Sequence, residues 1–108
     1  MIKFDKIEEK SLAGFKGGDG VFNAKMLTDE LNKIIMGRLE PGSSIGLHTH
    51  EDSSEIMYFI SGEGKVIHNG VEERIVASDC HCCKKGESHT VINDGSDDLI
   101  FFAVVPMQ

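Results

Sequence analysis

Short strand-like runs separated by turn signals fill the chain from residue 34 onward, and this arrangement is the feature that most restricts the fold. The runs occupy residues 34–40, 55–61, 64–68, 71–77, 80–83, 89–93 and 99–105. Asn69-Gly70, between two of these runs, is a strong signal for a tight β-hairpin. No helical periodicity of useful length is present. The pattern therefore predicts an all-β fold, a sandwich or barrel with little or no helix.

The first third of the chain carries a weaker pattern. Residues 21–27 are expected to form a short strand, and Thr28–Lys33 a turn or a single helical turn capped by Thr28. The glycines at positions 17, 18 and 20 lack the strand-then-helix context of a phosphate loop. At 108 residues the chain is expected to be a single domain, with N-terminal strands and loops at 1–33 and a barrel core at 34–105.

Charge and composition limit the partners. The formal net charge is −7, with no basic stripe, which argues against binding a nucleic-acid backbone or an anionic membrane. Residues 1–18 lack the apolar core of a signal peptide, and no run is long enough to span a bilayer. The cysteines, bunched at Cys80, Cys82 and Cys83, do not form a disulfide framework and fit a reducing compartment. A cytoplasmic location is expected.

The role of the three cysteines stays open between two readings. On a strand Cys80 and Cys82 face together, and cysteine is among the most buried residue types, so core filling is the favoured reading. The other reading is a redox or ligand role, although adjacent cysteines without a second ligand pair do not fit a zinc finger. His68 and His81 are expected at the surface, with His68 far from any site.

Residues 42–62 concentrate the side chains that can carry chemistry. His48 and His50 are two apart, which places both imidazoles on one face of an extended strand. Glu55 opens the next strand-like run, and a third histidine, His89, lies in a later one. Imidazole nitrogen and carboxylate oxygen are good ligands for first-row divalent metals. The four side chains therefore predict a metal site, and the alternative is a polar strand face that carries imidazoles.

These residues resemble the first of the two cupin motifs, in which glycines bracket an H-x-H pair and a glutamate. The matching positions are Gly42, His48, His50, Glu55 and Gly62 for the first motif, and Gly86, His89 and Asn93 for the second. The second motif departs from the pattern at Ser78 and Lys84, where glycine and proline are usual. The short distance between the motifs is similar to that in small single-domain bacterial cupins. The resemblance implies an antiparallel double-stranded β-helix, a jelly-roll barrel of two sheets.

The resemblance also implies a ligand set. His48, His50, Glu55 and His89 would bind one divalent transition metal, with manganese, iron, nickel and zinc as candidates, because the ligands alone do not choose among them. Four protein ligands leave one or two positions open to water or substrate. Serine can replace glycine at position 78 where the backbone is not left-handed, so this departure concerns the geometry of the barrel rim rather than metal binding.

Further side chains are expected around the metal. The substrate-pocket candidates are Arg38, Met57, Phe59, Lys84, Val91 and Phe102. The two basic candidates would hold a substrate carboxylate, with a solvated barrel rim as the alternative. Core packing explains Met57, Phe59 and Val91 equally well. For Phe102 the register is open, because Phe101 could point inward instead.

A metal-dependent enzyme acting on a small oxygen-rich molecule is the favoured function, with oxidative cleavage or decarboxylation as the reaction. Glu55 is the catalytic candidate, because the resemblance to cupin dioxygenases suggests that it leaves the metal and serves as a base. The first alternative is a non-catalytic module that binds a sugar, an organic acid or a metal. The second, a sugar-isomerase-like cupin, is weaker because no independent general base is evident.

Two apolar faces on one strand indicate assembly. In residues 55–61, one face carries Glu55, Met57 and Phe59, and the opposite face carries Ile56, Tyr58 and Ile60. A strand with two apolar faces has to be covered on both. The sequence therefore predicts a homodimer in which a second subunit supplies part of the cover.

Overall fold

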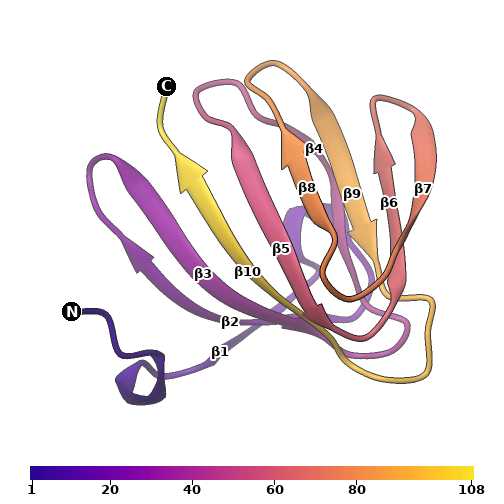
Figure 1. Cartoon of the computed structure of the whole chain (residues 1–108), viewed down its shortest axis with the longest axis horizontal. Coiled ribbons are helices and arrows are strands. Elements are labelled where there is room, and N and C mark those ends of the chain that lie inside the picture. The colour runs from indigo at the N-terminus through magenta and orange to yellow at the C-terminus, as the bar shows by residue number, and fades with distance from the viewer.

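Two antiparallel β-sheets packed face to face make up the protein, as the computed structural model of residues 1–108 shows (Figure 1). The large sheet has the strand order β1-β2-β3-β10-β5-β8, and the small sheet has the order β4-β9-β6-β7. The large sheet contains β1 (Lys10–Ala13), β2 (Val21–Thr28), β3 (Asn32–Leu39), β5 (Glu55–Ser61), β8 (Cys80–Cys83) and β10 (Leu99–Pro106). The small sheet contains β4 (Ser44–Thr49), β6 (Gly64–His68), β7 (Val71–Ile75) and β9 (Ser88–Ile92). The predicted all-β jelly roll is confirmed.

Helix is limited to two short 3-10 segments, η1 (Phe4–Lys6) and η2 (Phe15–Gly17). No helix has the length and apolar character that crossing a membrane requires. The η2 segment packs closely on β4, because a Cβ on either Gly18 or Gly46 would overlap a carbonyl oxygen of the facing segment. This close approach holds the η2 side chains next to the small sheet.

Alternation along the strands builds the core between the sheets. On β5, Glu55, Met57 and Phe59 are buried while Ile56 and Tyr58 are exposed, as the sequence predicts. Strand β10 alternates in the same way. Fourteen buried apolar side chains from both sheets form one cluster. This cluster holds the sheets together and fixes the strand ends that carry the polar residues described below.

Two hairpins show how local residues set the strand register. Asn69-Gly70 joins β6 to β7 with φ angles of 49° and 81°, the left-handed values that a type I′ turn requires, so the hairpin prediction is confirmed. Between β2 and β3, the Asp29 carboxylate accepts hydrogen bonds from the backbone N–H groups of Leu31 and Asn32 at 2.8 and 2.7 Å. The predicted Thr28 cap is wrong, because Thr28 still belongs to β2 and Asp29 satisfies the turn.

A β-bulge in β4 turns its histidine into the interior. Ile45 pairs with Val91 and His48 pairs with His89, so two residues of β4 stand opposite the single Thr90. The extra residue shifts the alternation, and His48 therefore points inward although it lies three positions after the buried Ile45. The Thr90 hydroxyl donates a hydrogen bond of 2.6 Å to the Ile45 carbonyl oxygen at the bulge.

Ser78 lies in the turn between β7 and β8 with a φ of 77°. The condition under which serine replaces glycine without cost is therefore not met. In that region a side chain costs free energy that glycine does not. The backbone N–H of Ser78 donates a hydrogen bond of 2.8 Å to the Phe59 carbonyl oxygen, which holds the turn against β5 in spite of this cost.

The side chains of β8 point in the opposite directions to those predicted. The pairing of β8 with β5 places Cys83 opposite the buried Glu55, and His81, two residues earlier, lies on the same inward face. Cys80 and Cys82 point outward and are exposed. The core-filling prediction for Cys80 and Cys82 is therefore wrong, and Cys83 is the buried thiol.

Candidate metal centre

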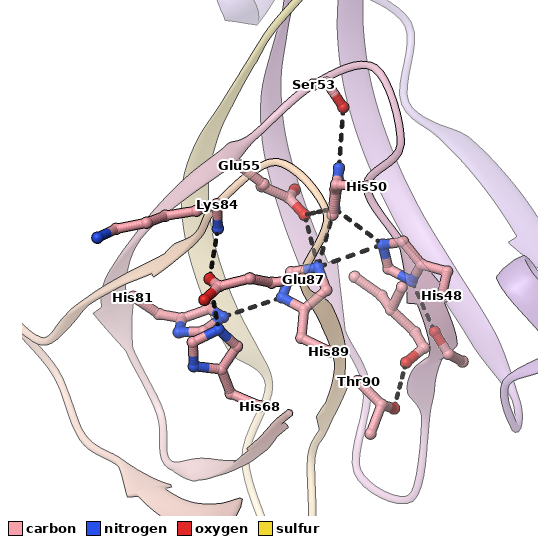
Figure 2. Close-up of polar contacts among 12 residues, drawn as sticks. His48, His50, Ser53, Glu55, His68, His81, Lys84, Glu87, His89 and Thr90 are labelled. Carbon is pink, nitrogen blue, oxygen red and sulfur yellow. Dashed lines mark hydrogen bonds and ion pairs between the residues drawn. The ribbon is translucent and has the colours of Figure 1, made fainter. Parts of the chain in front are cut away.

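Three histidines and one glutamate meet where β4, β5 and β9 approach one another (Figure 2). His48 lies in β4 and His50 directly after it, Glu55 is the first residue of β5, and His89 lies in β9. Figure 2 shows the three imidazoles and the carboxylate directed toward one another. One donor atom from each of the four residues lies within 4.8 Å of all the others. The fold thus brings together the four residues that the sequence singled out.

The Nε2 atoms of the three imidazoles form a nearly equilateral triangle. The Nε2–Nε2 distances are 3.2 Å between His48 and His50, 3.1 Å between His50 and His89, and 3.2 Å between His89 and His48. A carboxylate oxygen of Glu55 lies 3.3 Å from Nε2 of His50 and 3.1 Å from Nε2 of His89. His48 is farther from this carboxylate. The distance from its donor nitrogen to a Glu55 carboxylate oxygen is more than 4.0 Å and at most 4.8 Å.

These distances match four corners of an octahedron. With ligand bonds of about 2.1 Å, adjacent corners are about 3.0 Å apart and opposite corners about 4.2 Å apart. The five short distances fit adjacent corners, and the long one sets His48 opposite Glu55. A tetrahedron would make all six distances about equal, near ~3.4 Å. The donor set therefore fits one octahedral divalent cation, with two corners that no side chain fills.

Hydrogen bonds at the other ring nitrogens direct the Nε2 lone pairs to the centre. The partners of the Nδ1 atoms are the Gly46 carbonyl oxygen for His48 (2.7 Å), the Ser53 hydroxyl for His50 (3.0 Å) and Nε2 of His81 for His89 (2.9 Å). A carbonyl oxygen only accepts, so His48 carries its proton on Nδ1 and presents a bare Nε2. Such partners orient metal-binding imidazoles. Lone pairs directed at one point fit a cation, because they repel one another without it.

Burial and the contacts within the group set its charge states. Burial lowers the pKa of His48, and the adjacent His89 and His50 lower it further. Burial by itself would raise the pKa of Glu55, but the close approach of His50 and His89 to its carboxylate outweighs this effect and brings the pKa down to about 2. An ionised carboxylate beside neutral imidazole is the protonation state in which these groups bind metals.

A cavity of about 300 Å³ opens beside the group. His48, His50 and Glu55 line it, whereas His89 is fully buried behind them. Its apolar lining consists of Phe15, Phe22, Met26, Ile35, Ile45, Val105 and Met107. This volume is at the lower end for ligand pockets, so the cavity suits a small molecule.

The basic lining of the cavity comes from segments that the sequence pattern did not single out. Lys16 in η2 and Lys33 in β3 both line it. The packing of η2 on β4 positions Lys16, and Lys33 lies two places before the buried Ile35, on the same face of β3. Glu51 and Asp52, in the loop before β5, line the cavity as well. The cavity thus combines an apolar wall with two lysines and, besides Glu55, two acidic residues.

The two basic residues expected to hold a substrate lie elsewhere. Arg38 is on the outer face of β3, because Leu39 beside it is inward, and its guanidinium pairs with Glu9 at 2.9 Å and Asp98 at 3.2 Å. Lys84 is exposed in the turn after β8, and its side chain points away from the four ligand candidates (Figure 2). Neither residue lines the cavity.

The apolar pocket candidates belong to the core or to the outer surface. Met57, Phe59 and Val91 are at most 1% exposed and do not line the cavity, so the core-packing alternative describes them. Phe102 points outward and packs edge-on against the aromatic ring of η1, with 6.2 Å between centroids. Its neighbour Phe101 is the inward residue and is fully buried.

Two further histidines extend the group, although both were expected at the surface and His68 far away. Nε2 of His81 lies 2.9 Å from Nδ1 of His89, and His68 is the direct partner of His89 across β6 and β9. The rings of His68 and His81 are in edge contact, with 5.0 Å between centroids. Burial lowers the pKa of His81 to about 4. The only indication in the sequence is that position 81 lies two residues from position 83, so His81 and the buried Cys83 share one face of the strand.

Comparisons with known proteins agree with this architecture. Residues 35–105 match the family model described as the cupin domain. A curated relative, the oxalate-binding protein of Thermotoga maritima, is 38% identical over 111 residues, which cover 97% of this chain and 92% of that protein. The similarity therefore extends over nearly the whole of both chains.

Solved structures give the same result. The crystal structure of a predicted oxalate decarboxylase from Thermotoga maritima has a TM-score of 0.93 at 32% identity, and the match covers 100% of this chain and 99% of that one. A sugar phosphate isomerase from Silicibacter pomeroyi has a TM-score of 0.82 at 20% identity, with 100% and 76% covered. The second likeness concerns the fold alone.

Proposed function

The chain belongs to the cupin family, and on that premise we propose that it binds one divalent transition metal and, beside it, a small carboxylate anion of the oxalate type. The metal ligands in this proposal are His48, His50, Glu55 and His89. The observation that carries it is the octahedral spacing of their donor atoms at the wall of a small cavity. Manganese, iron, nickel and zinc all suit neutral imidazole and carboxylate donors.

The metal, when bound, supplies Lewis acidity and two coordination positions that no side chain fills. The remaining work falls to the cavity lining. Lys16 and Lys33 provide the positive charge that balances an anion in a chain whose net charge is −7. The apolar wall around Phe22 and Ile35 limits the water that competes for these charges, and a less polar surrounding strengthens them. A small anion fits the volume, and the metal together with the two lysines would supply positive charge for it.

The oxalate class rests on the relatives. The Thermotoga maritima protein at 38% identity is named an oxalate-binding protein, and the structure at 32% identity is named a predicted oxalate decarboxylase. Oxalate presents two carboxylate oxygens at once, so it could occupy both positions that the four side chains would leave open on a bound metal. Monocarboxylates offer a single charge and are expected to bind more weakly.

An enzyme of the decarboxylase or oxygenase type is the second candidate. The unfilled corners favour it, since catalytic metal sites keep a position open for substrate. The Glu55 base expected from the sequence is a weak proton acceptor while its pKa is about 2. Glu51 and Asp52 are the other carboxylates at the cavity, so they are the candidates for proton transfer in such a reaction.

Calorimetry with controlled metal content tests the proposal. The protein is stripped with a chelator, reloaded in turn with Mn²⁺, Fe²⁺, Ni²⁺ or Zn²⁺, and titrated with oxalate, malonate and acetate. Oxalate binding that needs the metal and disappears in His48→Gln is the expected result. Equal oxalate binding with and without metal, or none in any form, would contradict it. Release of carbon dioxide or uptake of dioxygen in the same samples would favour the enzyme.

We also propose that two copies associate through the outer face of the large sheet. Ile56, Tyr58 and Ile60 lie there and are 44–45% exposed. Clustered exposed apolar side chains of this kind are typical of interaction surfaces. Light scattering is expected to give the mass of two chains for the wild type and of one chain for Tyr58→Glu. A monomeric wild type at micromolar concentration would refute the dimer.

A further inference from the structure

Beside the metal centre, three more metal-binding side chains converge from separate parts of the chain. His68 ends β6, Cys83 ends β8, and Glu87 lies in the turn that leads into β9. One donor atom from each lies within 4.8 Å of the other two. We propose that His68, Cys83 and Glu87 form a second metal site, separate from the first, which binds Zn²⁺ and clamps these three segments together.

Strand register brings these residues to one place. His68 pairs with His89 across the small sheet, and Cys83 pairs with Glu55 across the large sheet, so both point into the interior next to the first site. The Glu87 carboxylate accepts a hydrogen bond of 2.8 Å from the backbone N–H that begins its own turn. The same carboxylate oxygen lies 2.9 Å from Nε2 of His68. Two of the three donors are thus already oriented toward each other.

The donor atoms differ in kind from those of the first site. The first group offers nitrogen and oxygen only, whereas the second adds the sulfur of Cys83. Thiolate, imidazole and carboxylate together are typical zinc ligands, and sulfur favours zinc over manganese or magnesium. In a tetrahedral zinc site the donors are about 3.3–3.7 Å apart, so the observed spacing requires only small side-chain movements. His81 is engaged with His89, so the fourth ligand is a water molecule.

Two acidic side chains lie near the buried Cys83. Its side chain is fully buried with the core residues, and Glu55 is its partner on the neighbouring strand. Burial raises the pKa of the thiol to about 11, and the nearby Glu87 and Glu55 carboxylates contribute to this rise. A cation at this point would draw the thiol and Glu87 together.

Solvent reaches this cluster by its own route. The side chains of His68 and Glu87 are 26% and 30% exposed. His68 and His81 also line a cavity that is open to solvent on this side. The cavity beside the first site contains none of the three proposed ligands in its lining. A metal ion can therefore load the second site without passing through the first.

Binding of Co²⁺ and Zn²⁺ by the chelator-stripped full chain tests the second site. A thiolate bound to Co²⁺ gives a charge-transfer band in the near ultraviolet, which a site with only nitrogen and oxygen ligands cannot give. The wild type is expected to bind two equivalents of Co²⁺ and to show this band. The matched control Cys80→Ser/Cys82→Ser is expected to keep the two equivalents and the band, because these thiols face outward. Cys83→Ser is expected to lose the band and one equivalent.

Two further variants keep the test decisive. His68→Gln alters a partly exposed residue and is expected to remove the same equivalent, so the outcome does not depend on how well Cys83→Ser folds. His48→Gln/His50→Gln removes the first site and is expected to keep the band, and Zn²⁺ still raises its Tm. One equivalent without a band in the wild type, or a band that survives Cys83→Ser, would overturn the second site. A band without oxalate binding would overturn only the proposed function, which rests on the first site, and would leave the second site standing.

Discussion

Nδ1 of His89 and Nε2 of His81 lie 2.9 Å apart, so a ligand candidate of the metal centre is itself held by an imidazole from another strand. His89 is fully buried and has no freedom to find another partner. The contact keeps Nε2 of His89 directed at the centre, as outer partners of metal-binding histidines do. The geometry of the centre therefore depends on β8, a strand that supplies none of its four ligands.

Replacing His81 tests this dependence. His81→Leu removes the partner of His89 and is expected to weaken metal binding by about 10–100-fold, the usual cost of losing an outer partner. His81→Gln keeps an oxygen that can accept from Nδ1 and is expected to restore part of the affinity. Calorimetric titration of the stripped protein with Mn²⁺ measures both variants. Wild-type affinity in His81→Leu would show that packing alone orients His89.

Lys16 and Lys84 give opposite predictions for anion binding. Lys16 lines the cavity, so Lys16→Gln is expected to weaken oxalate binding roughly tenfold, the equivalent of about 1.4 kcal/mol. Lys84 points away from the centre, so Lys84→Gln is expected to leave oxalate binding unchanged. Both variants are compared in the metal-loaded state by calorimetry. A loss of affinity in Lys84→Gln but not in Lys16→Gln would reverse the assignment.

Arg38 is expected to matter for stability rather than for ligand binding. Its guanidinium joins β3 to the N-terminal segment and to the loop before β10 through Glu9 and Asp98. Arg38→Met is therefore expected to lower the free energy of unfolding by about 0.5–1 kcal/mol, as for exposed ion pairs. Oxalate binding should be unchanged. Urea unfolding at pH 7 and the calorimetric assay above measure the two effects.

The stability effect of Arg38 should depend on pH. Its hydrogen bond to Glu9 holds the pKa of that carboxyl below the usual 4.5. A group whose pKa is lower in the folded state stabilises the fold above its unfolded pKa, and this contribution is lost as the pH falls through the folded value. The difference between wild type and Arg38→Met should therefore shrink between pH 5 and pH 3 (about the range in which such carboxyls titrate). A difference that grows at acid pH would be inconsistent with this pair.

Ser78 offers a stabilising substitution. Its φ of 77° lies where glycine is favoured, so Ser78→Gly is expected to raise the free energy of unfolding by up to about 1 kcal/mol. Gly70→Ser is the matched control, because Gly70 has a φ of 81° and open space around its missing Cβ. This control is expected to lose a similar amount. Thermal unfolding of both variants measures the effect, and a lower Tm in Ser78→Gly would contradict it.

Local patterns in the sequence predicted much of the fold and the four ligand candidates. Alternation and turn residues identify most strands. The two-residue spacing of His48 and His50 places both imidazoles on one face, and this inference needs no information from residues far away in the sequence. The sequence does not reveal the bulge opposite Thr90, although this bulge turns His48 inward. That feature arises from the pairing of two strands, which single-strand periodicity does not contain.

Features set by strand register and by loop packing escaped prediction. Three of the four residues of β8 are cysteine, so apolar character could not decide whether the face of Cys80 or that of Cys83 is inward. The pairing with Glu55 decides it, and the same pairing brings His81 to the centre. Lys16 reaches the cavity only because η2 packs on β4 at glycine positions. No periodic signal marks that contact.

Anomalous diffraction from crystals of the metal-loaded protein shows whether the four side chains bind a metal. One metal peak is expected, bound by Nε2 of His48, His50 and His89 and by an oxygen of Glu55, with His48 opposite Glu55 and non-protein ligands at the two remaining corners. A space between these four side chains that holds no metal, or a metal bound there in a tetrahedral arrangement, would show that the proposed centre is wrong.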